Sequence, residues 1–133
     1  MIKQLVCIAC PRGCRLTVRI EDTENPPSAK NVEVSGNSCP KGIVYGRQEV
    51  ICPMRTLTTT LPYTAKNMKN TVMRLPVKTL TEIPLRDIII TMQKIRAIRI
   101  TKPVNCGDII AVLKGEDGAN ISVSACASTE DFV

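Results

Sequence analysis

The chain has 133 residues and a formal net charge of +6. This length suits one domain or two small ones, and it excludes a large enzyme with its own dinucleotide-binding half. The chain contains no histidine, which excludes Ser-His-Asp and Cys-His catalysis and any zinc site that needs an imidazole ligand. Its three aromatic residues, Tyr45, Tyr63 and Phe132, are too few for a base-stacking surface, so we do not expect nucleic acid as a partner.

The positive charge is concentrated in the middle of the chain. Residues 54–102 carry ten basic and two acidic side chains, whereas residues 103–133 carry one basic and five acidic side chains. Such a basic segment can bind an acidic protein, a phosphate-bearing ligand or nucleic acid, or it can form an ordinary solvated surface. The longest apolar runs are too short for a membrane-spanning helix, and the first residues lack the apolar core of a signal peptide. We therefore expect a soluble, cytoplasmic protein.

The N-terminal part of the chain predicts a small antiparallel sheet. Residues 5–8 form a short apolar run, and residues 15–20 alternate polar and apolar side chains. Residues 32–34 resume the alternation. Residues 21–30 contain Asn-Pro-Pro-Ser, which is typical of a loop. The cysteines lie at one end of the expected sheet.

A helix and a second unit are expected to follow this sheet. Residues 41–50 predict a short helix that begins after a proline and is weakened by two glycines. Residues 54–63 are rich in Thr and Leu and should be extended, and residues 65–70 form a polar connection. We expect two domains, a cysteine-bearing metal module over 1–62 and a small α+β domain over 63–133.

The C-terminal half predicts one helix followed by about three strands. Apolar side chains at three- and four-residue spacing indicate an amphipathic helix over 84–96. The pattern changes to alternation over 97–100, which predicts a strand, and residues 107–113 and 121–124 predict two more. The predicted fold class is α+β: a small antiparallel sheet with a cysteine-rich loop and a short helix, then a helix packed on a few strands.

The cysteine spacing is the pattern that bears most directly on chemistry. Cys7, Cys10 and Cys14 lie close together, and Cys39 follows 24 residues later, in the pattern C-x2-C-x3-C-x24-C-P-K-G. In a reducing compartment, such cysteines favour metal ligation or redox chemistry over structural disulfides. A C-x2-C turn lets two thiolates meet at one metal, the third cysteine wraps the loop around it, and the fourth closes the site. Four thiolates suit an iron–sulfur cluster or a tetrahedral zinc ion.

Two features favour an iron–sulfur cluster over zinc. Three local ligands with one remote ligand are common among four-cysteine clusters, whereas zinc ribbons usually pair two C-x2-C turns. Proline follows both Cys10 and Cys39, as it follows the last ligand of the bacterial ferredoxin run. Lys41 lies two residues after Cys39, where its charge would stabilise the reduced cluster. The alternative to a metal site is that these cysteines are buried side chains or form disulfides.

The other three cysteines lie outside this spacing. Cys52 precedes a proline and is an alternative fourth ligand, although Cys39 has the better context. Cys106 and Cys126 flank the last two predicted strands, where we expect small buried side chains. A thioredoxin-like dithiol formed by Cys7 and Cys10 is a weaker hypothesis, because the Pro-Arg-Gly sequence that follows is a poor helix start.

Residues 5–60 resemble the N-terminal iron–sulfur domain of the molybdopterin oxidoreductases, the formate dehydrogenase and nitrate reductase group. In that family, cysteines in this pattern hold a [4Fe-4S] cluster, and the lysine after the last one lies between cluster and pterin. The resemblance implies a [4Fe-4S] cofactor with five cofactor-binding residues: Cys7, Cys10, Cys14, Cys39 and Lys41. The remaining chain is too short for the large pterin-binding domains.

A longer part of the chain is similar to a family of small uncharacterised bacterial and archaeal proteins with paired CxxC-type cysteines. The similarity rests on segments 7–18, 36–42, 53–60, 75–79 and 107–110. Members of that family look like accessory partners of flavin-dependent oxidoreductases related to glycerol-3-phosphate dehydrogenase and NADH oxidase. The resemblance implies that this chain serves such an enzyme.

Two hypotheses of different classes result. The first is a non-catalytic electron-transfer accessory protein, in which the four cysteines hold an iron–sulfur cluster and the basic segment 54–102 docks a flavin-dependent oxidoreductase. The alternative is a structural four-cysteine zinc module whose basic segment binds nucleic acid or an acidic protein. Because both hypotheses use the same cysteines and the same charge, the identity of the metal distinguishes them.

Overall fold

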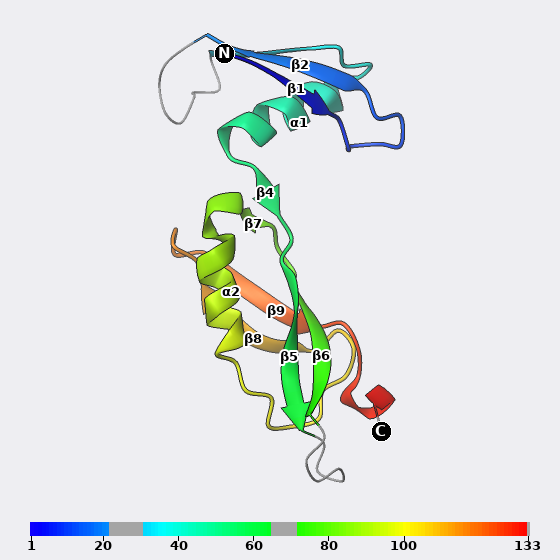
Figure 1. Cartoon of the computed structure of the whole chain (residues 1–133), viewed down its shortest axis with the longest axis vertical. Helices are drawn as coiled ribbons and strands as arrows, with labels where there is room; N and C mark the ends of the chain where they lie inside the picture. The colour runs from blue at the N-terminus through cyan, green and yellow to red at the C-terminus, as the bar shows by residue number, and fades with distance from the viewer. Residues whose placement is uncertain (22–30, 65–71, 133) are drawn as a thin grey trace. The chain divides into compact units, whose positions relative to one another are not determined.

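A computed structural model describes residues 1–21, 31–64 and 72–132 of the chain. The fold class is α+β, which confirms the prediction (Figure 1). The chain divides into two compact units, Met1–Met54 and Arg55–Val133. Most of the expected loop over 21–30 and the expected connection over 65–70 lie outside the described residues.

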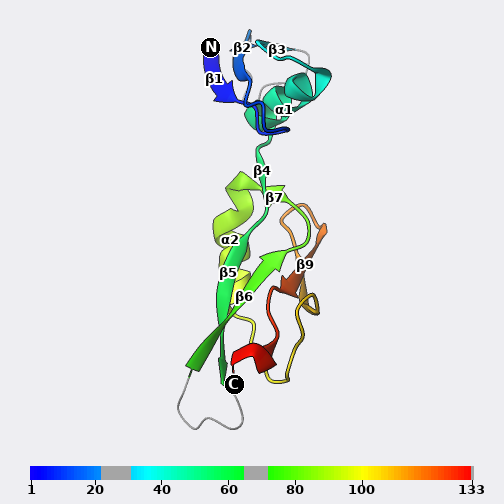
Figure 2. The same cartoon turned by 90° about the vertical axis from the view of Figure 1, so that its right-hand side faces the viewer.

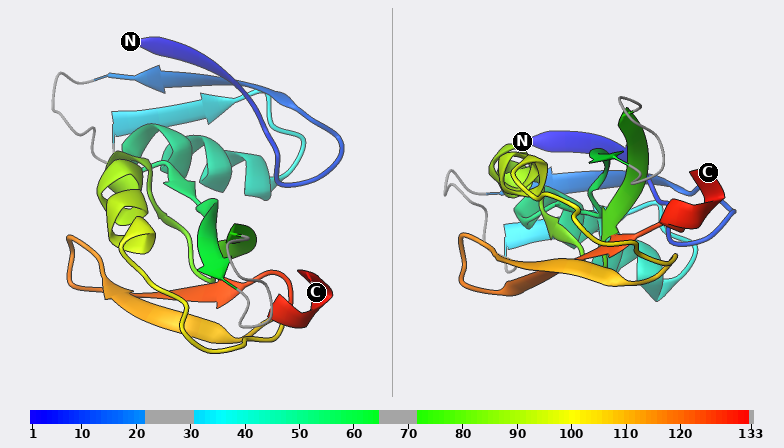
Figure 3. Two further views of the ribbon diagram at one scale, coloured as in Figure 1. Left: turned by 60° about the horizontal axis from the view of Figure 1, so that its bottom comes forward. Right: turned by 90° about the horizontal axis from the view of Figure 1, so that it is seen from below.

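The first unit is a three-stranded antiparallel sheet with one helix. Its sheet has the order β1-β2-β3, and the helix α1 lies across one face of it (Figure 3). The elements of this unit are β1 (Ile2–Val6), β2 (Arg15–Ile20), β3 (Val32–Ser35) and α1 (Pro40–Ile51). The central strand β2 buries every second side chain: Leu16, Val18 and Ile20. The alternation seen in the sequence therefore marks the inner face of this strand.

Two glycines let α1 approach the sheet closely. A Cβ atom at Gly46 would lie 2.9 Å from a methyl carbon of Val34, and one at Gly42 would lie 2.8 Å from Cβ of Asn37. The glycines that weaken the helix by propensity are thus the residues through which it packs. The helix starts with a proline at its first turn and ends just before Pro53, because a residue before proline is disfavoured in the helical conformation.

The second unit is built on a four-stranded sheet of order β5-β6-β9-β8, whose antiparallel strands β5 and β6 lie side by side in Figure 2. The short strands β4 and β7 pair separately. The strands and helices after α1 are β4 (Met54–Arg55), β5 (Thr58–Thr64), β6 (Val72–Thr79), β7 (Ile83–Pro84), η2 (Leu85–Asp87), α2 (Ile88–Arg96), β8 (Ile109–Lys114), β9 (Asn120–Ala125) and η3 (Thr129–Phe132). Odd-numbered side chains of β5, β6 and β9 face the core, among them Leu61, Leu75, Val77, Ile121 and Val123.

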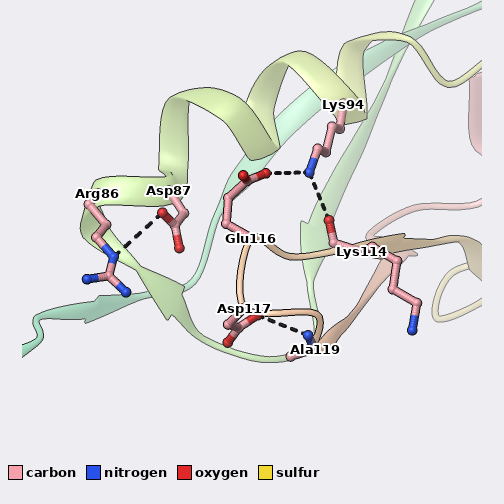
Figure 4. A network of polar contacts seen from close by, with 7 residues as sticks. All are labelled: Arg86, Asp87, Lys94, Lys114, Glu116, Asp117 and Ala119. Atoms are coloured by element: carbon pink, nitrogen blue, oxygen red, sulfur yellow. Dashed lines mark hydrogen bonds and ion pairs between the residues drawn. The ribbon is translucent and has the colours of Figure 1, made fainter.

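The helix α2 packs on this core through Ile95 and is also joined to the turn between β8 and β9. Lys94 Nζ donates to Glu116 Oε1 at 2.8 Å and to the carbonyl oxygen of Lys114 at 2.9 Å (Figure 4). Asp117 Oδ1 accepts a hydrogen bond from the backbone N–H of Ala119, which closes the turn. These polar contacts lie at the surface, so the buried apolar side chains provide most of the packing energy.

Besides shifted element ends, such as β1 over Ile2–Val6 and α2 from Ile88, the structure differs from the sequence-based prediction at three places. Residues 97–100 were expected to form a strand but do not, because Ile98 continues from α2 by donating its N–H to the carbonyl oxygen of Ile95 at 2.9 Å. No element was predicted over Val72–Thr79, where the structure forms β6 although it contains Pro76 and proline is rare inside sheets. The division at Met54–Arg55 precedes the expected boundary at 62, and β5 runs across that position.

No helix in the described part of the chain is both long enough and apolar enough to span a membrane.

Candidate functional site

The loop that carries the first three cysteines connects β1 to β2. The backbone N–H of Cys7 donates to the carbonyl oxygen of Cys14 at 2.8 Å, so the two ends of the loop are held together. Cys7 is buried, Cys14 is half-buried and Cys10 is exposed. Gly13 has a φ of 63°, a left-handed conformation that glycine adopts without strain. The ladder between β1 and β2 therefore places Cys7 beside Cys14 and leaves the middle of the loop, with Cys10, in solvent.

The turn before α1 lies against this loop. Sγ of Cys14 and Oγ of Ser38 are 3.2 Å apart and hydrogen-bonded. Gly36 lies so close to β2 that a Cβ there would be 2.3 Å from the carbonyl oxygen of Arg15. The register of β2 and β3, in which Thr17 faces Ser35, brings these segments together. The remote part of the cysteine pattern is thereby placed next to the local part.

Cys39 and Lys41 lie at the start of α1. Cys39 is the N-cap residue, with extended backbone angles and no side-chain cap. Its carbonyl oxygen accepts hydrogen bonds from Nδ2 of Asn37 and from the N–H of Gly42, each at 3.1 Å. Cys39 is half-buried and Lys41 is exposed. The N-terminus of α1 and the loop after β1 lie at the same end of the first unit (Figure 3).

The surroundings of Cys14 lower the pKa of its thiol. The side-chain hydrogen bond with Ser38 is the largest cause that lowers the pKa of Cys14, followed by a backbone hydrogen bond from Ser38. Partial burial of the thiol raises this pKa, and the positive charge of Arg12 lowers it further. A lowered pKa favours the thiolate, which is the form that binds metals.

The four cysteines do not form a ligand cage in this structure. Among the residues that the structure describes, no group of three or more cysteine, aspartate or glutamate side chains is arranged to hold a metal ion. The donor chemistry nevertheless fits a thiolate-ligated centre. Cys7 and Cys14 are joined through the backbone, Cys14 contacts the residue before Cys39, and Cys10 is on the exposed part of the same loop.

Cys52 is separated from these residues by the whole length of α1. Cys39 and Cys52 cap opposite ends of the helix, which at 1.5 Å per residue places them roughly 20 Å apart. Sγ of Cys52 instead contacts Sδ of Met54 at 3.9 Å. Cys52 is therefore not positioned as an alternative to Cys39.

Cys106 and Cys126 were expected to be buried, and that expectation is wrong, because both are exposed. They lie next to each other: Sγ of Cys106 donates a hydrogen bond to the carbonyl oxygen of Cys126 at 3.3 Å. The spacing along the chain gave no sign of this pairing, since the two residues are 20 positions apart.

The basic segment exposes most of its cations within the described residues. The exposed basic side chains between 54 and 102 are Arg74, Lys78, Arg86, Arg96, Arg99 and Lys102. Arg74 and Lys78 alternate along β6 with the buried Leu75 and Val77, so they lie on the outer face of the sheet.

The sequence analysis did not identify Ser38 as a site residue. Its position directly before Cys39 was the signal that could have pointed to it.

A family model matches residues 40–124, and its description is "Protein of unknown function (DUF1667)". The matched range begins one residue after Cys39 and includes Lys41. No curated protein and no solved structure matches the chain. Because the model covers more than half of the chain, this protein belongs to the DUF1667 family.

Proposed function

We propose that this protein is an electron-transfer accessory protein that carries one iron–sulfur cluster, a [4Fe-4S] centre, on its first unit and serves a flavin-dependent oxidoreductase. Cys7, Cys10, Cys14 and Cys39 would hold the cluster. When bound, such a cluster supplies one-electron transfer. The chain's own residues bind the cluster, adjust its charge environment and dock the partner.

The contact between Cys14 and Ser38 is the observation that carries this proposal. It joins two segments that are 24 positions apart and leaves Cys39 as the next residue along the chain. The proposal requires that the loop end with Cys10 and the turn with Cys39 move so that the four thiols face one centre. Both segments are at the surface, where such movement costs little burial.

Charge near the cysteines supports the same proposal. The lowered pKa of Cys14 favours its thiolate, which is the form that binds metals. Lys41 is exposed two residues after Cys39. Its cation would favour the reduced cluster, which carries one more negative charge than the oxidised form.

The exposed cations of the second unit support docking to an acidic protein surface. Six basic side chains are exposed there between residues 54 and 102. An excess of exposed charge of one sign steers the encounter with a partner of opposite sign, and salt weakens the effect. We propose that a flavin-dependent oxidoreductase of the glycerol-3-phosphate dehydrogenase or NADH oxidase type is this partner.

The first test is metal analysis of protein purified without oxygen. We expect a brown protein that absorbs at about 400 nm. The iron and the acid-labile sulfide should each amount to about four atoms per chain. After reduction with dithionite, a paramagnetic signal should appear. One zinc per chain with no iron would refute the iron–sulfur assignment and favour a structural zinc module.

Two cysteine variants provide the matched comparison. Cys10→Ser should lose most of the iron and sulfide, because it removes an exposed ligand without disturbing the core. Cys52→Ser should retain them, since Cys52 caps the far end of α1. Equal iron in both variants would contradict the assigned ligands.

A kinetic test addresses the docking surface. Reduced flavin mononucleotide, an anionic donor, should bleach the absorption of the oxidised cluster at a rate that falls as salt is raised. Reversal of Arg96 and Arg99 to Glu should weaken this salt dependence. A rate that does not respond to salt would contradict the role of the basic segment.

A further inference from the structure

Cys106 and Cys126 form a second pair of thiols in the second unit, which the proposed function does not use. The thiol of Cys106 donates to the carbonyl oxygen of Cys126 at 3.3 Å. Both residues are exposed. A contact from the sulfur of one cysteine to the main chain of the other requires that the two residues be neighbours in space.

Hydrogen bonds hold the segment just before β8 against the end of β9, next to the two cysteines. The N–H of Gly107 donates to the carbonyl oxygen of Ala125 at 2.8 Å, and the N–H of Ala125 donates to the carbonyl oxygen of Asp108 at 2.9 Å. Two residues thus oppose one, as in a β-bulge whose first residue is glycine, and Gly107 has a φ of 93°. Cys106 and Cys126 are the next residues outward in the two segments, and the contact from Cys106 Sγ to the carbonyl oxygen of Cys126 joins them.

This placement fits the geometry of a disulfide. Residues that face each other in an antiparallel ladder have Cα atoms about 4.5–5.5 Å apart. Disulfides form between cysteines whose Cα atoms are about 4.4–6.8 Å apart. If the pairing continues outward by one residue from Gly107 and Ala125, a disulfide between the two cysteines requires only rotation of their exposed side chains.

The backbone holds both cysteines in this position. The N–H of Cys126 donates to the carbonyl oxygen of Pro76 at 2.8 Å. This hydrogen bond holds the backbone of Cys126 against the neighbouring strand β6. The N–H of Cys106 donates to Oγ of Ser128 at 3.1 Å, and the turn before β8 is closed by Asp108, which accepts from the N–H of Asn105. The main chain is thus ordered while the thiols remain in contact with solvent.

We propose that Cys106 and Cys126 are a reversible dithiol–disulfide pair that reacts with low-molecular-weight disulfides. A thiolate of one cysteine attacks a sulfur of the small disulfide, so that a protein–S–S bond forms and one small thiolate leaves. The second cysteine then attacks the protein sulfur of this mixed disulfide and releases the second small thiol. The protein loses two electrons and two protons, and the small disulfide gains both.

The sequence makes this pairing easy to detect. Trypsin does not cleave between Lys102 and Pro103, so Cys106 lies alone in peptide 100–114 and Cys126 lies alone in peptide 115–133. Full-length protein is incubated without oxygen in mixtures of oxidised and reduced glutathione, alkylated and digested. We expect peptides 100–114 and 115–133 to become linked, with the loss of two hydrogen atoms, as oxidised glutathione is raised. The link should disappear when reduced glutathione is added in excess.

Three variants make the test specific. In Cys106→Ser the linked pair should be lost and Cys126 should carry a single glutathione, and the reciprocal result is expected for Cys126→Ser. Cys52→Ser, which changes a cysteine of the first unit, should leave the linkage unchanged. Separate glutathione adducts on both cysteines of the unmodified sequence at every ratio, or linkage of either to another cysteine, would overturn the proposal. Neither result depends on whether the first unit binds a metal.

Discussion

Gly36 controls how closely the turn before Cys39 approaches β2, so its replacement by alanine tests the architecture of the candidate site. Two costs combine at this position. Its φ of 83° is a left-handed conformation that costs an alanine roughly 1–2 kcal/mol. Its Cβ would also lie 2.3 Å from the carbonyl oxygen of Arg15, a backbone atom that cannot move aside without shifting β2. Overpacking of this kind costs roughly 1–3 kcal/mol.

The total of about 2–5 kcal/mol is large for this unit, because a 54-residue unit has a stability of roughly 3–8 kcal/mol at the usual value per residue. Hydrogen exchange of the Val18 amide on the central strand measures opening of the first unit alone. We expect Gly36→Ala to accelerate this exchange by about 30-fold to a few thousand-fold, at 1.4 kcal/mol per tenfold. The contact between Cys14 and Ser38 should weaken at the same time.

Gly13→Ala is the matched control within the same unit. Gly13 also has a positive φ, 63°, but the nearest atom to its added Cβ would be a methyl carbon of Val6 at 3.9 Å, an ordinary contact. Only the conformational cost of roughly 1–2 kcal/mol applies there, which gives about 5- to 30-fold faster exchange. If Gly36→Ala and Gly13→Ala accelerate exchange equally, the close approach of the turn to β2 has no energetic weight and our reasoning is refuted.

Three further predictions concern other contacts. In metal-free protein, Ser38→Ala should raise the pH at which Cys14 becomes reactive toward iodoacetamide, because the hydrogen bond with Ser38 is the main cause of its lowered pKa; an unchanged pH profile would contradict this. Leu75→Ala should destabilise the second unit by about 2–5 kcal/mol in urea denaturation, because this side chain is 1% exposed, and a loss below about 1 kcal/mol would show that the core collapses around the gap. Lys94→Met should cost less than about 1 kcal/mol, since its bond to Glu116 is at the surface, and high salt should abolish the difference.

Several elements could be predicted because their signals are local. The alternation over 15–20 corresponds to β2, and the expected helix over 41–50 corresponds to α1, since side-chain period and a first-turn proline act within a few residues. The α+β class followed from the same patterns. The strand β6 was not predicted, and it contains Pro76, whose carbonyl oxygen still accepts the N–H of Cys126. Residues 97–100 alternate like a strand but lack a pairing partner, and Ile98 and Ile100 pack singly on the core.

The amino-acid sequence by itself determined which thiols exist, their spacing and the concentration of positive charge in residues 54–102. Only the tertiary structure decided which groups lie beside each of these thiols. Cys14 lies beside Ser38, Cys106 lies beside Cys126, and Cys52 is kept at the far end of α1. The physical reason is that each of these placements depends on strand register or helix packing between segments far apart in the chain, where no local periodicity carries information.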